Sequence, residues 1–153
     1  YRLRNEKLIS KLSLKKFKLK KDKSKYEFVI YENKLDNSKN FVVKKGNFNQ
    51  NKTIPVRVIS TNLTNSKFIF KNKKIKKSFN HLSKFTNFVL IIINNKKVEK
   101  NDNDNAILRY YGIGAQIIKD LNIKNMLLVS RTKKRIIGLD GFGIKIKKQE
   151  IIK

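Results

Sequence analysis

Few side chains of this sequence have the chemistry of a catalytic or metal site. The chain contains no Cys and one His, His81, so a zinc site built from several nitrogen or sulfur ligands is not expected. A lone His beside Asn80 and Leu82 is more often structural or solvated than a ligand. Asp102 and Asp104 lie in a polar stretch, with no second acidic cluster to complete a cation site. The residue types therefore predict no metal.

A short glycine motif, Gly112-Ile113-Gly114, has two of the glycines of a dinucleotide-binding loop. The third glycine is missing, and no clear strand and turn precede the motif, as that fingerprint requires. We prefer the interpretation that small residues here let a helix pack closely against its neighbours.

Positive charge is the dominant feature of the composition. Lys and Arg number 38 against 11 Asp and Glu, which gives a net charge of +27 at pH 7. Such a surface attracts polyanions. The densest run spans residues 71–77, and its possible polyanion contacts are Lys71, Lys73, Lys74, Lys76 and Lys77. The same run would also form an ordinary solvated helix face.

A second explanation of the positive charge, based on which cation is used, has equal weight. Only six of the 38 cations are Arg, the residue whose fork binds phosphates and bases in bidentate fashion. Lys, Asn, Ile, Phe, Tyr and Met, whose codons are rich in A and T, make up 87 of the 153 residues. Drift of the genome toward A+T would produce this composition without selection for RNA binding.

Apolar periodicity predicts the elements that would position these side chains. Residues 1–12 have spacing typical of a helix end, 13–25 read as a short strand or basic linker, and 94–105 as a loop. The expected strands are 26–31, 41–45, 54–60, 88–93, 126–129 and 143–148, and the expected helices are 74–85, 106–121 and 133–139. This order, N-terminal antiparallel hairpins followed by alternating strands and helices, predicts a mixed α/β (α+β) fold.

Aromatic residues on the apolar faces are expected in the core rather than as platforms for stacking bases. They are Phe41, Phe68, Phe79, Phe85, Phe88 and Phe142. The longest apolar run, residues 88–93, is far shorter than the 18 residues of a membrane span. With no signal-peptide pattern either, we expect a cytoplasmic protein without a membrane partner, an organelle or an A+T-rich symbiont being possible sources.

The C-terminal third resembles a known family. Residues 108–121 (LRYYGIGAQIIKDL), 125–129 (NMLLV) and 137–144 (IGLDGFGI) are similar to the end of GTP cyclohydrolase II. They are most similar to the form fused behind 3,4-dihydroxy-2-butanone-4-phosphate synthase in riboflavin biosynthesis. The resemblance extends more weakly upstream. It implies that residues 1–25 are a basic linker or the end of a preceding synthase domain, and that 26–153 are the cyclohydrolase-like domain.

Departures from the family pattern concern its zinc site. The family holds zinc with three Cys, and the metal supplies the hydroxide that opens the purine ring. Asn62 stands where the first Cys is expected, Thr61 where the family has Glu, and residues 73–75 (Lys-Lys-Ile) where the paired Cys should fall. Because an ammonium group would repel a cation, we expect zinc and cyclohydrolase activity to be lost, with no catalytic residue remaining.

Three cations match anion-binding positions of the family. Arg57 corresponds to an Arg before the zinc site, Arg109 to the Arg that faces the reacting phosphate, and Lys134 to a phosphate-contacting Lys. Without their carboxylate and hydroxyl neighbours, represented here by Ile107 and Val129, these cations would hold an anion without hydrolysing it.

These observations lead to two main functional hypotheses, and a working enzyme with a mechanism that does not use zinc remains a third. The first is an inactive GTP cyclohydrolase II-like domain that gives structural or regulatory support to a dihydroxybutanone phosphate synthase, with a homodimer or a synthase domain as partner. The alternative is a basic protein that reuses this fold to associate with RNA or the ribosome.

Overall fold

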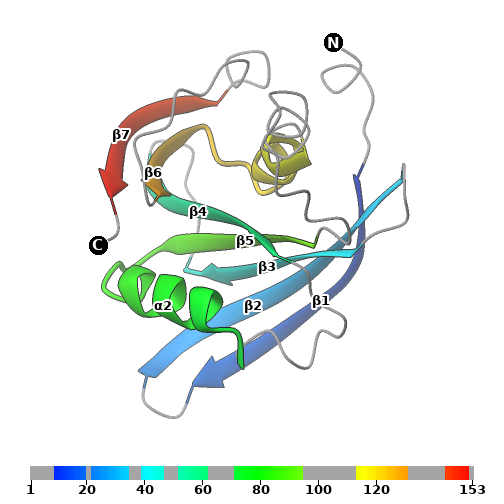
Figure 1. The fold of residues 1–153 in the computed structure, drawn as a ribbon, viewed down its shortest axis with the longest axis horizontal. Coiled ribbons are helices and arrows are strands. Elements are labelled where there is room, and N and C mark those ends of the chain that lie inside the picture. The colour runs from blue at the N-terminus through cyan, green and yellow to red at the C-terminus, as the bar shows by residue number, and fades with distance from the viewer. Residues whose placement is uncertain are drawn as a thin grey trace.

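The computed structural model describes residues 9–19, 22–34, 39–46, 52–61, 71–94, 113–130 and 144–151. Seven strands in these segments form one sheet in the order β1-β2-β3-β5-β4-β6-β7 (Figure 1). They are β1 (Ile9–Leu19), β2 (Asp22–Asn33), β3 (Lys39–Lys45), β4 (Thr53–Thr61), β5 (Phe88–Asn94), β6 (Asn125–Ser130) and β7 (Lys145–Ile151). The same described segments contain two helices, α2 (Lys73–Leu82) and a helix over residues 113–120. The mixed α/β fold predicted from the sequence is thereby confirmed.

The first half of the sheet is antiparallel. β1 pairs with β2, β2 with β3, and β3 with β5. The segment YEFVIY within β2 has the β-branched and aromatic residues that suit a pleated, half-buried surface. β3 ends before Gly46, whose φ of 83° lies in the left-handed region that glycine adopts without strain. The expected β2–β3 hairpin is confirmed.

The second half of the sheet is parallel. β4 lies between β5 and β6, and β6 pairs with β7, all in the same direction. The chain passes from β4 to β5 through α2, as parallel neighbours require a crossover connection. β5 reads FVLIIIN, and its first six residues are all buried. A continuous apolar run is typical of a strand that is covered on both faces.

The sheet separates the hydrophobic core into two clusters, and one of the described helices packs on each face. Val89, Ile91 and Ile93 of β5 belong to the cluster that includes the helix at 113–120. Phe88, Leu90 and Ile92 point the other way, into the cluster that contains Ile75 and Leu82 of α2. The alternation follows from the two-residue period of a strand. Of the aromatics expected in the core, Phe41 and Phe88 are buried and Phe79 and Phe85 pack against the second cluster.

Some element boundaries differ from the sequence-based expectation. Residues 9–12 begin β1 rather than ending a helix, because backbone pairing with β2 overrides their local spacing. Residues 13–19 and 22–25 belong to strands β1 and β2, which pair with each other. The predicted domain boundary after residue 25 therefore falls inside β2. α2 ends at Leu82 rather than at residue 85, and β7 extends to Ile151.

Several predictions fall outside the described residues. They are residues 1–8 of the predicted helix end, residues 95–105 of the predicted loop, residues 106–112 of one predicted helix and the whole predicted helix 133–139. The aromatics Phe68 and Phe142 also lie outside the described residues. Within the described residues, neither helix has the length and apolar character needed to cross a membrane.

Candidate functional site

Arg57 is the one family-matched cation that the structure describes, and it is buried. It lies on β4 with 6% of its surface exposed. Its Nε donates to Ser78 Oγ of α2 at 3.4 Å, and its Nη1 donates to the backbone carbonyl of Val129 at 3.5 Å. Both distances exceed the usual range of about 2.7–3.2 Å, so each bond is individually weak. The guanidinium therefore joins two strands and a helix within the protein.

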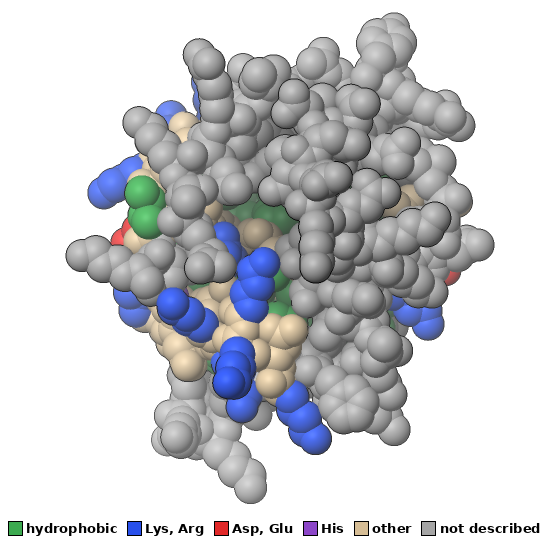
Figure 2. Space-filling view, in the orientation of Figure 1, with side chains coloured by type: hydrophobic (Ala, Val, Ile, Leu, Met, Phe, Trp, Pro, Cys, Tyr) green, Lys and Arg blue, Asp and Glu red, His purple; other side chains and the backbone are tan. Residues whose placement is uncertain are grey.

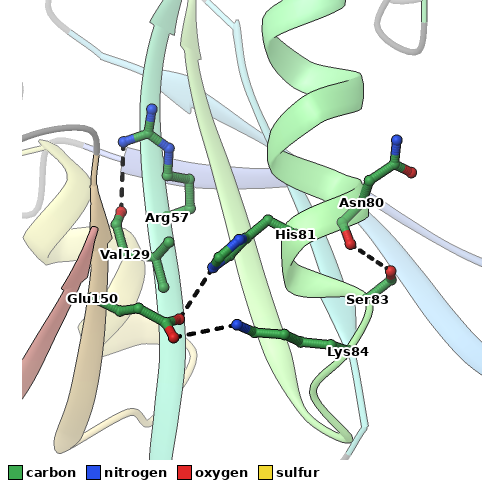
Figure 3. Close-up of polar contacts among 7 residues, drawn as sticks. All are labelled: Arg57, Asn80, His81, Ser83, Lys84, Val129 and Glu150. Carbon is green, nitrogen blue, oxygen red and sulfur yellow. Dashed lines mark hydrogen bonds and ion pairs between the residues drawn. The ribbon is translucent and has the colours of Figure 1, made fainter. Parts of the chain in front are cut away.

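The register of the parallel strands places Arg57 in line with an acidic residue of β7. Arg57 pairs with Val129 of β6, and Val129 pairs with Glu150 of β7. Paired residues of neighbouring strands share a face of the sheet, so all three lie on the face that α2 covers. Two strand spacings, roughly 10 Å, separate the backbones of Arg57 and Glu150. Figure 3 shows both side chains beside the C-terminal half of α2.

Glu150 is the centre of a small polar cluster, which we call the α2–β7 clamp and which consists of His81, Lys84 and Glu150 (Figure 3). Its Oε2 lies 3.1 Å from Nε2 of His81, and its Oε1 accepts a bond from Nζ of Lys84 at 3.2 Å. The hydrogen bond from His81, followed by the bond and charge of Lys84, lowers the pKa of Glu150 below its ordinary value. The clamp ties the last strand to the helix.

The clamp and Ser78 together contain a Ser, a His and a Glu, the types used in nucleophilic hydrolysis. Such a triad requires an accessible Ser hydroxyl that is hydrogen-bonded to the imidazole. Ser78 is only 2% exposed, and its oxygen accepts from Arg57. The arrangement is therefore suited to holding β7 and α2 together rather than to attacking a substrate, and His81 contributes to it through its contact with Glu150.

A second polar contact lies on the opposite face of the sheet. The hydroxyl of Tyr31 on β2 donates to Oδ2 of Asp120, at the end of the helix over 113–120, at 2.7 Å. Nζ of Lys11 lies 3.7 Å from the same oxygen. Burial, then the bond to Asp120, raises the pKa of the Tyr31 phenol far above its ordinary value. Tyr31 stays protonated and fastens the helix to the β1–β2 hairpin.

The structure describes only some of the other predicted site residues. The five lysines of residues 71–77 are exposed along α2 and the turn before it. Arg109 and Lys134 lie outside the described residues. Sequence reasoning missed Glu150 and the Tyr31–Asp120 pair. No spacing in the sequence signals these contacts, because their partners lie 69 and 89 residues away.

The positions matched to the paired zinc ligands do not fit a metal. Lys73 and Lys74 are exposed at the start of α2, and Ile75 is fully buried in the core beneath it. A buried isoleucine offers no lone pair, and two ammonium groups would repel the ion. In the part of the chain that the structure describes, no three His, Cys, Asp or Glu side chains gather around a common point. Asn62 lies outside that part.

Comparison with solved structures defines the class of fold. The chain aligns over its whole length with RibBX, described as a two domain 3,4-dihydroxy-2-butanone 4-phosphate synthase from A. baumannii, with a TM-score of 0.59. The alignment covers 42% of that protein at 18% sequence identity, which establishes similarity of fold.

Sequence comparison then relates the chain to particular proteins. Residues 93–151 match the family model of GTP cyclohydrolase II, which confirms the resemblance carried by YGIGAQI and GLDGFGI. The chain is 31% identical over 152 residues to a 3,4-dihydroxy-2-butanone 4-phosphate synthase of Sulfurospirillum multivorans; this covers 95% of the chain and 39% of that protein. It is 51% identical over 39 residues to the riboflavin biosynthesis protein RibBA of Bacillus subtilis, covering 26% of the chain and 10% of RibBA.

These matches make the chain a homologue of riboflavin-biosynthesis proteins. It spans less than half the length of each of these relatives.

Proposed function

We propose that this chain is a catalytically inactive GTP cyclohydrolase II-like domain that supports a dihydroxybutanone phosphate synthase. The Sulfurospirillum relative, which aligns with almost the whole chain, is named for the synthase. RibBX, which shares the fold, is likewise described as a two domain synthase. The chain thus corresponds to a segment of proteins that are named for the synthase reaction.

One observation carries the proposed loss of activity. Ile75, at a position matched to the paired zinc ligands, belongs to the hydrophobic core between α2 and the sheet. A metal site at this position would require a polar side chain in place of Ile75, which has no exposed surface. The chain also has no Cys at any other position to replace the thiolates. We therefore propose that zinc is absent and that the former site has been absorbed into the core.

The proposed supporting role implies a protein partner. We propose that this partner is a second copy of the chain or a synthase domain. We also propose that Arg57, Arg109 and Lys134 are relics of phosphate binding. Two N–H groups of the Arg57 guanidinium donate to Ser78 and to the carbonyl of Val129 inside the protein.

Incubation with GTP tests the loss of activity. The purified chain with zinc and GTP should release no formate above the blank, while an active GTP cyclohydrolase II in the same buffer does. A parallel metal analysis should find less than about 0.1 zinc per chain after dialysis, since no thiolate is present to retain it. Formate release above the blank would disprove the inactivity.

A chimaera tests the supporting role. In the Sulfurospirillum synthase, the aligned segment is replaced by this chain, and a truncated form of the same synthase ends before the segment. We expect the chimaera to keep the synthase activity and melting temperature of the parent, and the truncated form to lose part of either. A truncated enzyme as stable and active as the parent would refute the supporting role while leaving the inactivity result intact.

A further inference from the structure

The outer face of α2 concentrates positive charge on a fixed scaffold. Lys73, Lys74, Lys76 and Lys77 are exposed, as is Lys71, two residues before the helix begins. Ile75, Ser78 and Leu82 are buried, so the apolar side of α2 is fixed to the sheet. At about 100° per residue, the four helical lysines spread over the arc opposite Ile75. Figure 2 shows Lys and Arg side chains projecting from the surface that α2 forms.

The charge of this face is not balanced along the chain. Residues 71–87 contain no Asp or Glu, and the first turn of α2 has no acidic side chain. Lys73 and Lys77 are four residues apart, and Lys73–Lys76 and Lys74–Lys77 are three apart, so these ammonium groups repel one another. At the far end of α2, Glu150 is already engaged by His81 and Lys84. A bound polyanion would relieve the repulsion between the lysines.

The helix N-terminus itself is not the binding group. The side chain of Asn72 accepts from the backbone amides of Lys74 at 2.9 Å and Ile75 at 3.2 Å. With these amides occupied, an anion at this face would be held by the lysine ammonium groups. Lysines act as point charges rather than as the planar fork of Arg, and contacts to phosphate carry no sequence information.

The surroundings of the face favour a nucleic acid over a membrane. Among the residues whose burial the structure describes, the exposed large hydrophobic residue is Ile151 on β7, and the aromatics are buried or half-buried. A helix that lies in a membrane interface needs a free apolar face to insert, and a single-strand binder needs aromatic platforms. The face of α2 offers neither.

We propose that the outer face of α2 binds the phosphate backbone of double-stranded nucleic acid without sequence preference. Lys73 and Lys77 lie at the centre of this surface, Lys74 and Lys76 flank them, and Lys71 extends it. The activity goes beyond the proposed supporting role and does not depend on it.

Salt-dependent binding to a fluorescent 20-base-pair DNA duplex tests the surface. The variant K73Q/K76Q/K77Q is compared with K145Q/K147Q/K148Q, which removes three exposed lysines from the edge strand β7. Gln has nearly the helix propensity of Lys, so α2 should persist. Loss of three phosphate contacts should reduce the magnitude of the slope of log K against log salt by about 2.7. The affinity change between 50 and 200 mM salt should shrink roughly 40-fold.

Equal losses in the two triple variants would overturn the proposal, because they would show that only net charge matters. Stronger α2-dependent binding to vesicles containing anionic lipid than to the duplex would overturn it in favour of a membrane. Acetylation of the unmodified chain provides a measurement without mutants. The duplex should protect Lys73, Lys76 and Lys77 more than Lys145, Lys147 and Lys148, and uniform protection would contradict a localised site.

Discussion

At the scale of single residues, charged groups are used to connect elements. Glu150 joins β7 to α2 through His81 and Lys84, and Asp120 receives Tyr31 and Lys11 on the other face of the sheet. The chain has 38 Lys and Arg residues for 11 Asp and Glu residues, so cations greatly outnumber carboxylates. Glu150 and Asp120 therefore determine which elements these polar contacts connect.

Glu150→Gln should reduce stability only when the carboxylate is charged. The folded pKa of Glu150 is lowered, so its contribution is present above the ordinary value of 4.5 and is lost as the pH falls through the folded pKa. For a partly exposed ion pair we expect a loss of about 0.5–1 kcal/mol at pH 6. Urea unfolding of the wild type and the variant at pH 6 and pH 3 measures the difference, which should vanish at pH 3.

Glu32→Gln, which removes a carboxylate from β2, serves as the control for net charge. A difference between wild type and Glu150→Gln that persists unchanged at pH 3 would show that the carboxylate charge is not responsible.

At the scale of elements, α2 shows how local signals fix a helix. Asn72 has extended backbone angles, and its side-chain oxygen accepts from two amides of the first turn. The lysines disfavour this turn through repulsion and through the positive end of the helix dipole. The cap and the burial of Ile75 and Leu82 on the sheet counteract them.

Asn72→Ala should therefore cost about 1 kcal/mol of unfolding free energy, the usual effect of losing an N-cap. Circular dichroism during urea denaturation measures the change. Asn80→Ala is the matched control, since Asn80 is exposed within α2 and should alter stability by less than about 0.5 kcal/mol. Equal effects of the two substitutions would show that the cap is not needed.

Elements were the most predictable level of this structure. Strands β3 to β6 coincide closely with apolar patterns that the sequence displays locally, whereas β2 is longer at both ends than the predicted 26–31 and α2 ends three residues before the predicted 85. β1 was harder, because residues 9–12 have helical spacing and become a strand only through pairing with β2. The candidate site was less predictable still: Arg57 came from a family resemblance, whereas its contacts with Ser78 and Val129 depend on tertiary packing.

At the scale of the whole molecule, a net charge of +27 opposes compaction. Raising NaCl from about 50 to 500 mM screens both the ion pairs and the repulsion between like charges. Because 38 cations face 11 acidic residues, the weaker repulsion should have the larger effect on stability. The melting temperature should therefore rise with salt. Differential scanning calorimetry measures it, and K145Q/K147Q/K148Q should show a smaller rise. A melting temperature that falls with salt would show that specific ion pairs outweigh the global repulsion.

The sequence by itself determined the positive charge, the absence of thiolates, the local strand and helix patterns, and the C-terminal resemblance to GTP cyclohydrolase II. All of these follow from residue identity or from periods of two to four residues. Only the tertiary structure decided that Arg57, Val129 and Glu150 share one row, that Ile75 is core, and that the lysines of α2 face outward. These facts depend on which distant strands pair and on which side of the sheet each helix lies, and neither is encoded in short-range spacing.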